Sequence, residues 1–184
     1  MAKMVIGLVG EMASGKDVVK KYMGQKYAAK YCQYSTILRD VMDRLCLEKS
    51  RENMQKASTG LRQLFGEELL AKVIANDADK LEAEMVVVDG ARRMADIAYL
   101  KKLPQFVLVK IEAEPKIRYE RIKKRNENVG DSEKTFEAFV REHEAEAEKE
   151  IPIVMKEAKY LLDNNASLED LYKQVDALVL KLKG

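Results

Sequence analysis

The hydrophobic and polar positions of this chain form short apolar runs separated by longer segments with apolar side chains at helical spacing. The runs lack polar alternation, which indicates strands that are buried on both faces of a parallel sheet. The four clear runs are Met4–Val9, Met85–Val88, Phe106–Ile111 and Tyr160–Leu162. Tyr31–Tyr34 is a weaker fifth candidate, so the pattern predicts a sheet of five strands.

Helices are predicted in the segments between these runs. Residues 17–30 follow a glycine-rich loop, residues 67–84 carry apolar side chains at helical spacing, and residues 115–125 begin with a proline that suits a first helical turn. The last helix is expected to follow a capping pattern at Ser167 and to bury an apolar face that starts at Leu168. Strands that alternate with helices predict an open α/β sheet with right-handed crossovers.

Composition and charge restrict the class of protein. Of the 184 residues, 47% are hydrophobic and 35% are charged, as in a compact, helix-rich domain. The net charge is only +2, so the charge balance gives no reason to expect a nucleic-acid or membrane partner. The first apolar run is too short for a signal sequence, and no later run has the length of a membrane span. We therefore expect one cytoplasmic domain over residues 1–184.

The scarcity of histidine and cysteine excludes several kinds of site. His143 is the only histidine, so a histidine-rich metal site is excluded, and its acidic surroundings indicate an exposed helical position. Cys32 and Cys46 lack the spacing of a metal site or a redox pair. We expect both cysteines to be reduced.

The segment from Gly10 to Asp17 fits the pattern G-x-x-x-x-G-K of a phosphate-binding loop. Its glycines allow backbone N–H groups to turn toward phosphate oxygens, and the following helix directs its positive end at them. Lys16 can reach the β- and γ-phosphates, and a buried strand before the loop and a helix after it provide the required setting. The sequence thus predicts a nucleoside-triphosphate site. The residues expected to bind the nucleotide are Gly10, Ala13, Ser14, Gly15, Lys16, Asp17 and Val18.

Two aspartates are candidates for holding Mg²⁺. Asp17 stands where such loops usually have Ser or Thr, and it could bind the metal, act through a water molecule, or only favour the helix N-terminus as an acid. Asp89 ends the apolar run Met85–Val88 and could hold Mg²⁺ or one of its waters. An apolar strand followed by Asp-Gly is also a common turn signal, so the loop in the same chain is what favours a functional role.

With these motifs, the chain resembles the nucleoside monophosphate kinase family of P-loop proteins over nearly its full length. The Gly-Lys-Asp form of the loop is similar to that of phage-type deoxynucleoside monophosphate kinases. The resemblance implies a P-loop NTPase three-layer α/β sandwich with strand order 2-3-1-4-5. It implies a helical acceptor-binding insert at about residues 35–79 and a short lid at about residues 118–141. ATP and Mg²⁺ are the implied cofactors, and both a monomer and a homodimer stay open.

The resemblance also implies an acceptor site. Ser35–Arg39 looks like the segment in which adenylate kinases place an acceptor-phosphate arginine, which would be Arg39. Asp89–Arg93 looks like the family's Asp-Gly-x-x-Arg, which implies Asp89 as a ligand of a Mg²⁺-bound water and Arg93 as an acceptor-phosphate contact. Arg92 stands where related archaeal kinase-like proteins have their arginine, so both arginines are candidates.

Further matches concern the lid and the donor base. Arg121 and Arg125 are similar to the arginine pair at the root of the lid, and both are expected to be catalytic, as are Lys16 and Arg93. Asn165 lies in a loop that resembles the one contacting the donor base. The remaining candidate arginines are interpreted as solvated charges or as members of i,i+4 ion pairs. They are Arg62, Arg118 and Arg141.

The predicted function is transfer of the γ-phosphate of ATP to a nucleoside or deoxynucleoside monophosphate. Such an acceptor is already anionic, so the protein mainly aligns the substrates and neutralises charge, work that suits lysine, Mg²⁺ and arginines. One alternative is a dephospho-CoA kinase, which the tail Asp163–Leu168 resembles, although the paired aspartates expected after the second strand are absent near Ser35. The other is a nucleotide-binding regulatory module with weak NTPase activity.

Overall fold

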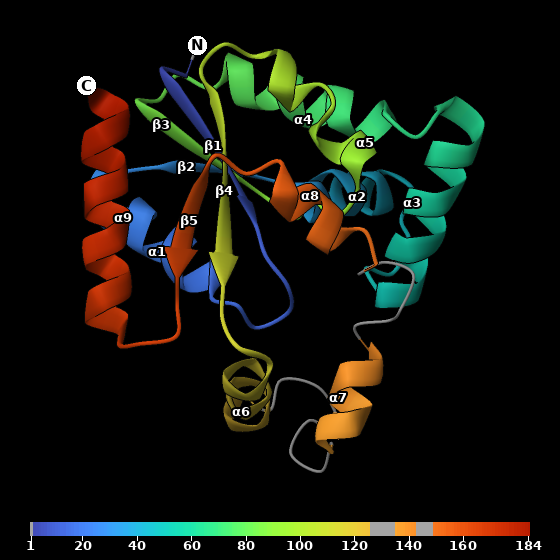
Figure 1. Ribbon diagram of the computed structural model, residues 1–184. Coiled ribbons are helices and arrows are strands. Elements are labelled where there is room, and N and C mark those ends of the chain that lie inside the picture. Colours follow the sequence, from blue (N-terminus) through green and yellow to red (C-terminus); the bar gives the residue numbers. More distant parts are fainter. Residues whose placement is uncertain (1, 126–134, 143–148) are drawn as a thin grey trace. The chain divides into compact units, whose positions relative to one another are not determined.

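The computed structural model describes residues 2–125, 135–142 and 149–184. Its five strands form one parallel sheet in the order β2-β3-β1-β4-β5, with helices on both sides (Figure 1). The predicted α/β architecture and strand order are therefore confirmed. The elements are β1 (Met4–Val9), α1 (Lys16–Tyr27), β2 (Lys30–Gln33), α2 (Tyr34–Arg44), α3 (Arg51–Phe65), α4 (Leu69–Lys80), β3 (Met85–Asp89), α5 (Met94–Ile97), η1 (Leu100–Lys102), β4 (Phe106–Glu112), α6 (Pro115–Arg125), α7 (Phe136–Glu142), α8 (Ile151–Lys156), β5 (Tyr160–Asp163) and α9 (Leu168–Lys183).

The chain divides into two compact units. The first comprises residues 1–7 and 28–107, and the second comprises residues 8–27 and 108–184. Residues 126–134 of the predicted lid and His143 lie outside the described residues. The single-domain assignment and the boundaries of the insert and the lid stay predictions. No helix within the described ranges is long and apolar enough to cross a membrane.

In the first unit, β2 and β3 pair in parallel and end in register. Gln33 lies opposite Asp89, and its Nε2 donates a hydrogen bond of 3.4 Å to Oδ2 of that aspartate. Helix α4 packs against both strands and buries an apolar face that includes Leu70 and Ile74. Helix α3 packs against α2 and α4, and Arg62 is its one buried residue.

In the second unit, β4 and β5 pair in parallel, and Glu112 lies opposite Asp163. Helix α9 lies along β5 and α1 (Figure 1). Ser167 caps this helix, since its Oγ accepts a hydrogen bond of 3.1 Å from the Asp170 backbone N–H. The apolar face starts one turn later than predicted, because Leu168 is 53% exposed in a first turn that extends beyond the end of β5.

A polar cluster joins α9 to α1, the helix that follows the glycine-rich loop. Asp176 accepts hydrogen bonds from Tyr22 Oη at 2.9 Å, Tyr27 Oη at 2.6 Å and Lys26 Nζ at 2.7 Å. Desolvation and the neighbouring carboxylate raise the pKa of Tyr27 to about 12, so its hydroxyl stays a donor at neutral pH. The cluster connects the second half of α1 to α9.

Two predicted helices are shorter in the structure. Helix α1 ends at Tyr27 because Ala28 adopts a positive φ of 52°, a conformation that ends a right-handed helix. Helix α4 ends at Lys80 because Leu81 is already extended. Tyr34, predicted to end a strand, instead begins α2. Helices α2, α3 and α4 together occupy the position of the predicted helical insert.

Candidate active site

The glycines of the loop between β1 and α1 are required by close contacts inside the second unit. A Cβ on Gly10 would lie 2.5 Å from the carbonyl oxygen of Ile111 in β4. Gly15 has a φ of +109°, and a Cβ there would overlap Nδ2 of Asn164 after β5. Both positions therefore exclude side chains for packing reasons, in addition to any close approach of phosphate.

The buried hydroxyl of Ser14 lacks a partner inside the loop. Ser14 is 1% exposed, and among the described residues its Oγ is a buried side-chain polar atom without a hydrogen bond. Buried polar groups are normally paired, and an unpaired one costs about 1–3 kcal/mol. A phosphate oxygen in the loop would satisfy this hydroxyl, so the residues present fit the nucleotide that such a loop implies.

Lys16 and Asp17 begin α1 and differ in their surroundings. The Lys16 ammonium donates to the backbone carbonyls of Gly10 at 2.6 Å and Glu11 at 3.0 Å, which holds it against the loop. Asp17 accepts a hydrogen bond of 2.8 Å from Lys20 Nζ, and this contact lowers the pKa of the aspartate. Asp17 is therefore an ionised carboxylate near the positive end of the helix.

Two arginines of α6 contact the loop, and their charges are balanced differently. Arg118 is 3% exposed and pairs with the carboxylate of Glu11 at 3.1 Å, so its interpretation as a solvated charge is wrong. Arg121 donates to the carbonyl of Asn164 at 2.8 Å and of Ala13 at 3.4 Å. Its hydrogen-bond acceptors among the described residues are carbonyl oxygens, whereas Arg118 pairs with a carboxylate. Arg118 is thus suited to bracing the loop, and Arg121 to attracting an anion.

Asn164 is a residue of this site that sequence reasoning missed. It is buried, and its Nδ2 donates 2.7 Å to the carbonyl of Ser14. The predicted neighbour, Asn165, instead accepts a hydrogen bond of 2.7 Å from the Glu114 backbone N–H. Its role toward a donor base stays a prediction. The Asp-Asn-Asn sequence that begins at the last residue of β5 was the available signal, but it does not distinguish the two amides.

Two further residues predicted on the donor side, Val18 and Arg125, can be placed only by their positions in the helices. Val18 lies in the first turn of α1. Arg125 is the last residue of α6, and its side chain lies outside the described part of the structure. Its catalytic role stays a prediction.

The acceptor arginines predicted in the first unit lie on α2 and in the loop between β3 and α5. Arg39, on α2, is exposed, and so is Arg92, in the loop after β3. Arg93 Nη1 donates a hydrogen bond of 3.1 Å to Oε2 of Glu67. Arg62, interpreted from sequence as a solvated charge, is instead buried and pairs with Asp96 at 2.6 Å. The interpretation of Arg62 from the sequence is wrong. Its partner Asp96 lies 34 residues further along the chain, where a local pattern does not reveal it.

The metal-binding role of Asp17 and Asp89 stays a prediction. Asp17 belongs to the second unit and Asp89 to the first. In the parts of the chain that the structure describes, no group of three or more His, Cys, Asp or Glu side chains is arranged to hold a metal ion.

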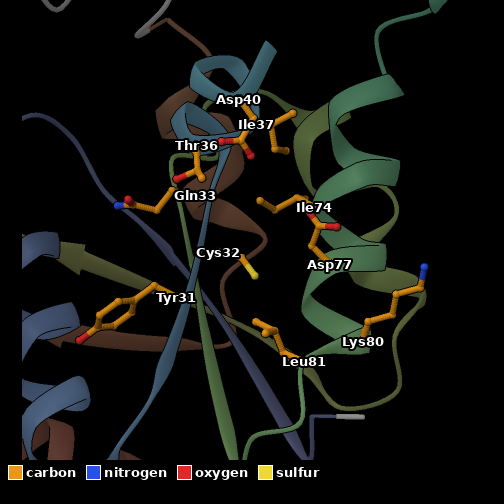
Figure 2. A pocket seen from close by; sticks show the side chains of 10 residues that line it. All are labelled: Tyr31, Cys32, Gln33, Thr36, Ile37, Asp40, Ile74, Asp77, Lys80 and Leu81. Atoms are coloured by element: carbon orange, nitrogen blue, oxygen red, sulfur yellow. The ribbon is translucent and has the colours of Figure 1, made fainter. Parts of the chain in front are cut away.

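A groove of about 350 Å³ lies between β2, α2 and α4 in the first unit (Figure 2). Its lining contains the carboxylates of Asp40 and Asp77 and the ammonium of Lys80, and none of the predicted acceptor arginines. Excess negative charge disfavours a phosphate here, so this groove is not suited to be the acceptor-phosphate site. The lining residues are Tyr31, Cys32, Gln33, Thr36, Ile37, Asp40, Ile74, Asp77, Lys80 and Leu81.

The two cysteines are expected to differ in reactivity. Cys32 points into this groove (Figure 2), and burial together with the charge of Asp77 raises its pKa to about 11. Cys46 is exposed. Because the thiolate is the reactive form, Cys46 should react with iodoacetamide at pH 8 at least about tenfold faster than Cys32. Mass spectrometry of the labelled peptides measures both rates, and equal rates would contradict the burial of Cys32.

Comparisons with known proteins agree with this architecture. A profile of the family described as AAA domain matches residues 9–139. A UPF0200 protein of Staphylothermus marinus is 29% identical over 182 residues, which cover 99% of this chain and 94% of that protein. The crystal structure of TT1252 from Thermus thermophilus has a TM-score of 0.62 at 17% identity and covers 100% of both chains.

A shikimate kinase from Bacteroides thetaiotaomicron likewise has a TM-score of 0.62 at 13% identity, covering 98% of this chain and 99% of that one. At these identities the likeness shows the fold, which is that of P-loop kinases. The resemblance to P-loop kinases noted in the sequence is confirmed at this level, whereas the nucleoside monophosphate kinase family stays a prediction. Since the matching profile begins at the last residue of β1 and includes the loop, β2, β3 and β4, it covers more than half of the chain, and the chain belongs to the AAA domain family.

Proposed function

We propose that this protein transfers the γ-phosphoryl group of ATP to the phosphate of a nucleoside or deoxynucleoside monophosphate. The observation that carries the proposal is the loop of the second unit, where the Ser14 hydroxyl has no hydrogen bond among the described residues and where Lys16 and Arg121 contact the loop carbonyls. Such a site binds a polyphosphate, and its P-loop kinase fold supports phosphoryl transfer as the reaction.

The donor nucleotide would be held by the loop and its flanking residues. Backbone N–H groups of the loop bind phosphate oxygens, and Lys16 neutralises charge on the β- and γ-phosphates. Arg121 and Arg125 would stabilise the charge that develops on the transferred group, because guanidinium groups stay ionised and donate in a planar fork. Asn165 would contact the donor base. The loop residues assigned to the nucleotide are Gly10, Ala13, Ser14, Gly15, Lys16, Asp17 and Val18.

The acceptor would be recognised through its phosphate by arginines of the first unit. Arg39 and Arg92 are exposed, and Arg93 pairs with a carboxylate that is itself 58% exposed. Solvent-exposed ion pairs are weak, so a phosphate can replace Glu67 on Arg93. An anionic phosphate needs no general base, which agrees with a reaction centre built from cations.

Mg²⁺ belongs to this proposal as the ion that neutralises charge on the β- and γ-phosphates when it is bound. Asp17 and Asp89 are the residues that would hold it or its waters. The lowered pKa of Asp17 keeps that carboxylate ionised at neutral pH, as a ligand must be.

A product assay tests the proposed function. The purified protein is incubated with Mg-ATP and each of a panel of nucleoside and deoxynucleoside monophosphates, dephospho-CoA and shikimate, the last because its kinases share this fold. We expect a nucleoside diphosphate from one or a few monophosphates. Phosphorylation of dephospho-CoA or shikimate alone would replace the proposed acceptor class. ATP binding without transfer to any acceptor would favour a regulatory module.

A further inference from the structure

A buried carboxylate fixes the backbone that carries the proposed acceptor arginines. Asp96, in α5, is buried, and its Oδ2 accepts hydrogen bonds from the backbone N–H groups of Arg92 at 2.8 Å and Arg93 at 3.0 Å. The loop leaves β3 through Gly90, whose φ is +100°. One carboxylate oxygen therefore holds two successive amides, the second of which belongs to Arg93, the N-cap residue of α5.

The other oxygen of the same carboxylate is held from α3. Arg62 Nη2 donates 2.6 Å to Oδ1 of Asp96, and its Nη1 donates 2.6 Å to the backbone carbonyl of Glu67. Tyr34 Oη donates 2.6 Å to the carbonyl oxygen of Asp96. The aspartate is thus held by α2 and α3 while it holds the loop.

A closed ring of contacts results. The side chain of Glu67 accepts a hydrogen bond of 3.1 Å from Arg93, and its backbone carbonyl accepts one from Arg62. Arg62 binds Asp96, which holds the backbone of Arg93. Within this ring the side chains of Arg62 and Asp96 are buried. The side chain of Arg93 is 36% exposed and that of Glu67 is 58% exposed.

The chemistry of the ring favours orientation over stability as its purpose. Transferring a carboxylate and a guanidinium from water to the interior is costly, and an apolar pair of equal volume often stabilises a fold as well. A buried carboxylate that accepts two adjacent backbone amides does something an apolar pair cannot do, because it defines one loop conformation. That conformation determines where the side chains of Arg92 and Arg93 emerge.

We propose that Asp96, oriented by Arg62, is a positioning residue for the acceptor arginines, and that Glu67 occupies Arg93 until an acceptor phosphate replaces it. The inference rests on the proposed function and deepens it. Asp96 and Arg62 act through the backbone of Arg92 and Arg93 and do not touch the substrate. Glu67 is the competing anion at the same guanidinium.

Opposite effects on acceptor affinity test this inference. Asp96→Asn keeps the shape of the side chain but loses the charge, so the acceptor KM should rise about 10- to 100-fold while the KM for ATP stays within about twofold. Glu67→Gln removes the competing charge but keeps the backbone carbonyl that Arg62 binds, so the acceptor KM should fall about two- to fivefold. If Asp96 and Glu67 only stabilised the fold, the two substitutions would not change the acceptor KM in opposite directions.

The matched control is Asp79→Asn, which alters another carboxylate of the same unit. Asp79 Oδ1 accepts a hydrogen bond of 3.1 Å from Gln105 and has no part in the ring, so both KM values should stay within about twofold of the original. If Asp96→Asn does not fold, Arg62→Lys keeps the positive charge but loses the fork, and it should raise the acceptor KM. An unchanged acceptor KM in a folded Asp96→Asn or Arg62→Lys protein, or the same change in Asp79→Asn, would overturn the inference.

A measurement without catalysis separates this inference from the proposed function. Amide hydrogen exchange of Arg92 and Arg93, followed by NMR, should accelerate about tenfold or more in Asp96→Asn and not in Asp79→Asn. Inorganic phosphate should shift the Arg93 side-chain resonance in the original protein and less in Asp96→Asn. If no acceptor is phosphorylated but both NMR effects appear, the acceptor assignment fails and the positioning role stands. Unchanged exchange would refute the positioning role whatever the activity.

Discussion

Replacing Lys16 with methionine is expected to lower the rate of phosphoryl transfer about 100- to 1000-fold. Methionine retains the apolar length of the side chain but removes the ammonium that bonds the loop carbonyls of Gly10 and Glu11. The lost charge is the one expected to face the β- and γ-phosphates. The rate is measured as nucleoside diphosphate formed under saturating Mg-ATP and acceptor, and ATP affinity is measured separately by calorimetry.

Lys21→Met is the matched control for this variant. Lys21 lies on the same helix and is exposed, so its loss changes the net charge equally without altering the loop. We expect its transfer rate to stay within about twofold of the original. Lys21→Met should unfold at the same temperature as the parent protein, whereas Lys16→Met also loses two hydrogen bonds to the loop and should unfold at a somewhat lower temperature. A Lys16→Met protein that transfers phosphate at the parental rate would show that the loop does not serve catalysis.

The strands illustrate how far a hydrophobic pattern can predict structure. The run Met4–Val9 matches β1 at both ends. The other three clear runs each end one residue early, since β3, β4 and β5 continue to Asp89, Glu112 and Asp163. In each of these strands the apolar residues end where the side chains cease to be buried, whereas the strand itself continues for one more residue, which is acidic. The weak fifth run was placed one residue too late at both ends, because Tyr34 begins a helix.

The arginines illustrate what a local pattern cannot predict. Charged side chains are seldom fully buried unless they are paired, so solvated positions were the natural expectation for Arg62 and Arg118. Each has a carboxylate partner distant in sequence: Asp96 for the first and Glu11 for the second. Only the folded chain brings these pairs together, and no spacing rule within one helix would reveal them.

In the segment after β5, the sequence likewise cannot distinguish between two adjacent residues. Asn164 and Asn165 are chemically identical and adjacent, so sequence supports either as a contact of the loop region. The fold selects Asn164 for the loop because its backbone N–H bonds Glu112 at 2.8 Å, and its amide reaches the Ser14 carbonyl. The glycine at position 15 has no side chain that would block this amide.

Gly15→Ala is accordingly expected to damage both the fold and nucleotide binding. Alanine disfavours the φ of +109°, and its Cβ would overlap the Asn164 amide. The loop must shift to relieve this overlap, which would weaken the hydrogen bond of 2.7 Å between Asn164 and Ser14. We expect a loss of about 1–3 kcal/mol in the free energy of unfolding and a loss of about 100-fold in ATP affinity, since such sites tolerate little displacement.

Gly60→Ala provides the control with the opposite sign. Gly60 lies inside α3, has no positive φ, and a Cβ there would meet nothing within 4 Å. Alanine in a helix is more stable than glycine by about 0.5–1 kcal/mol, so this variant should gain stability and bind ATP as before. Urea denaturation and titration calorimetry measure both quantities for each variant. If Gly15→Ala unfolds and binds ATP like the parent protein, the contact between the loop and Asn164 does not define the nucleotide site, and the argument from the Ser14 hydroxyl loses its geometric basis.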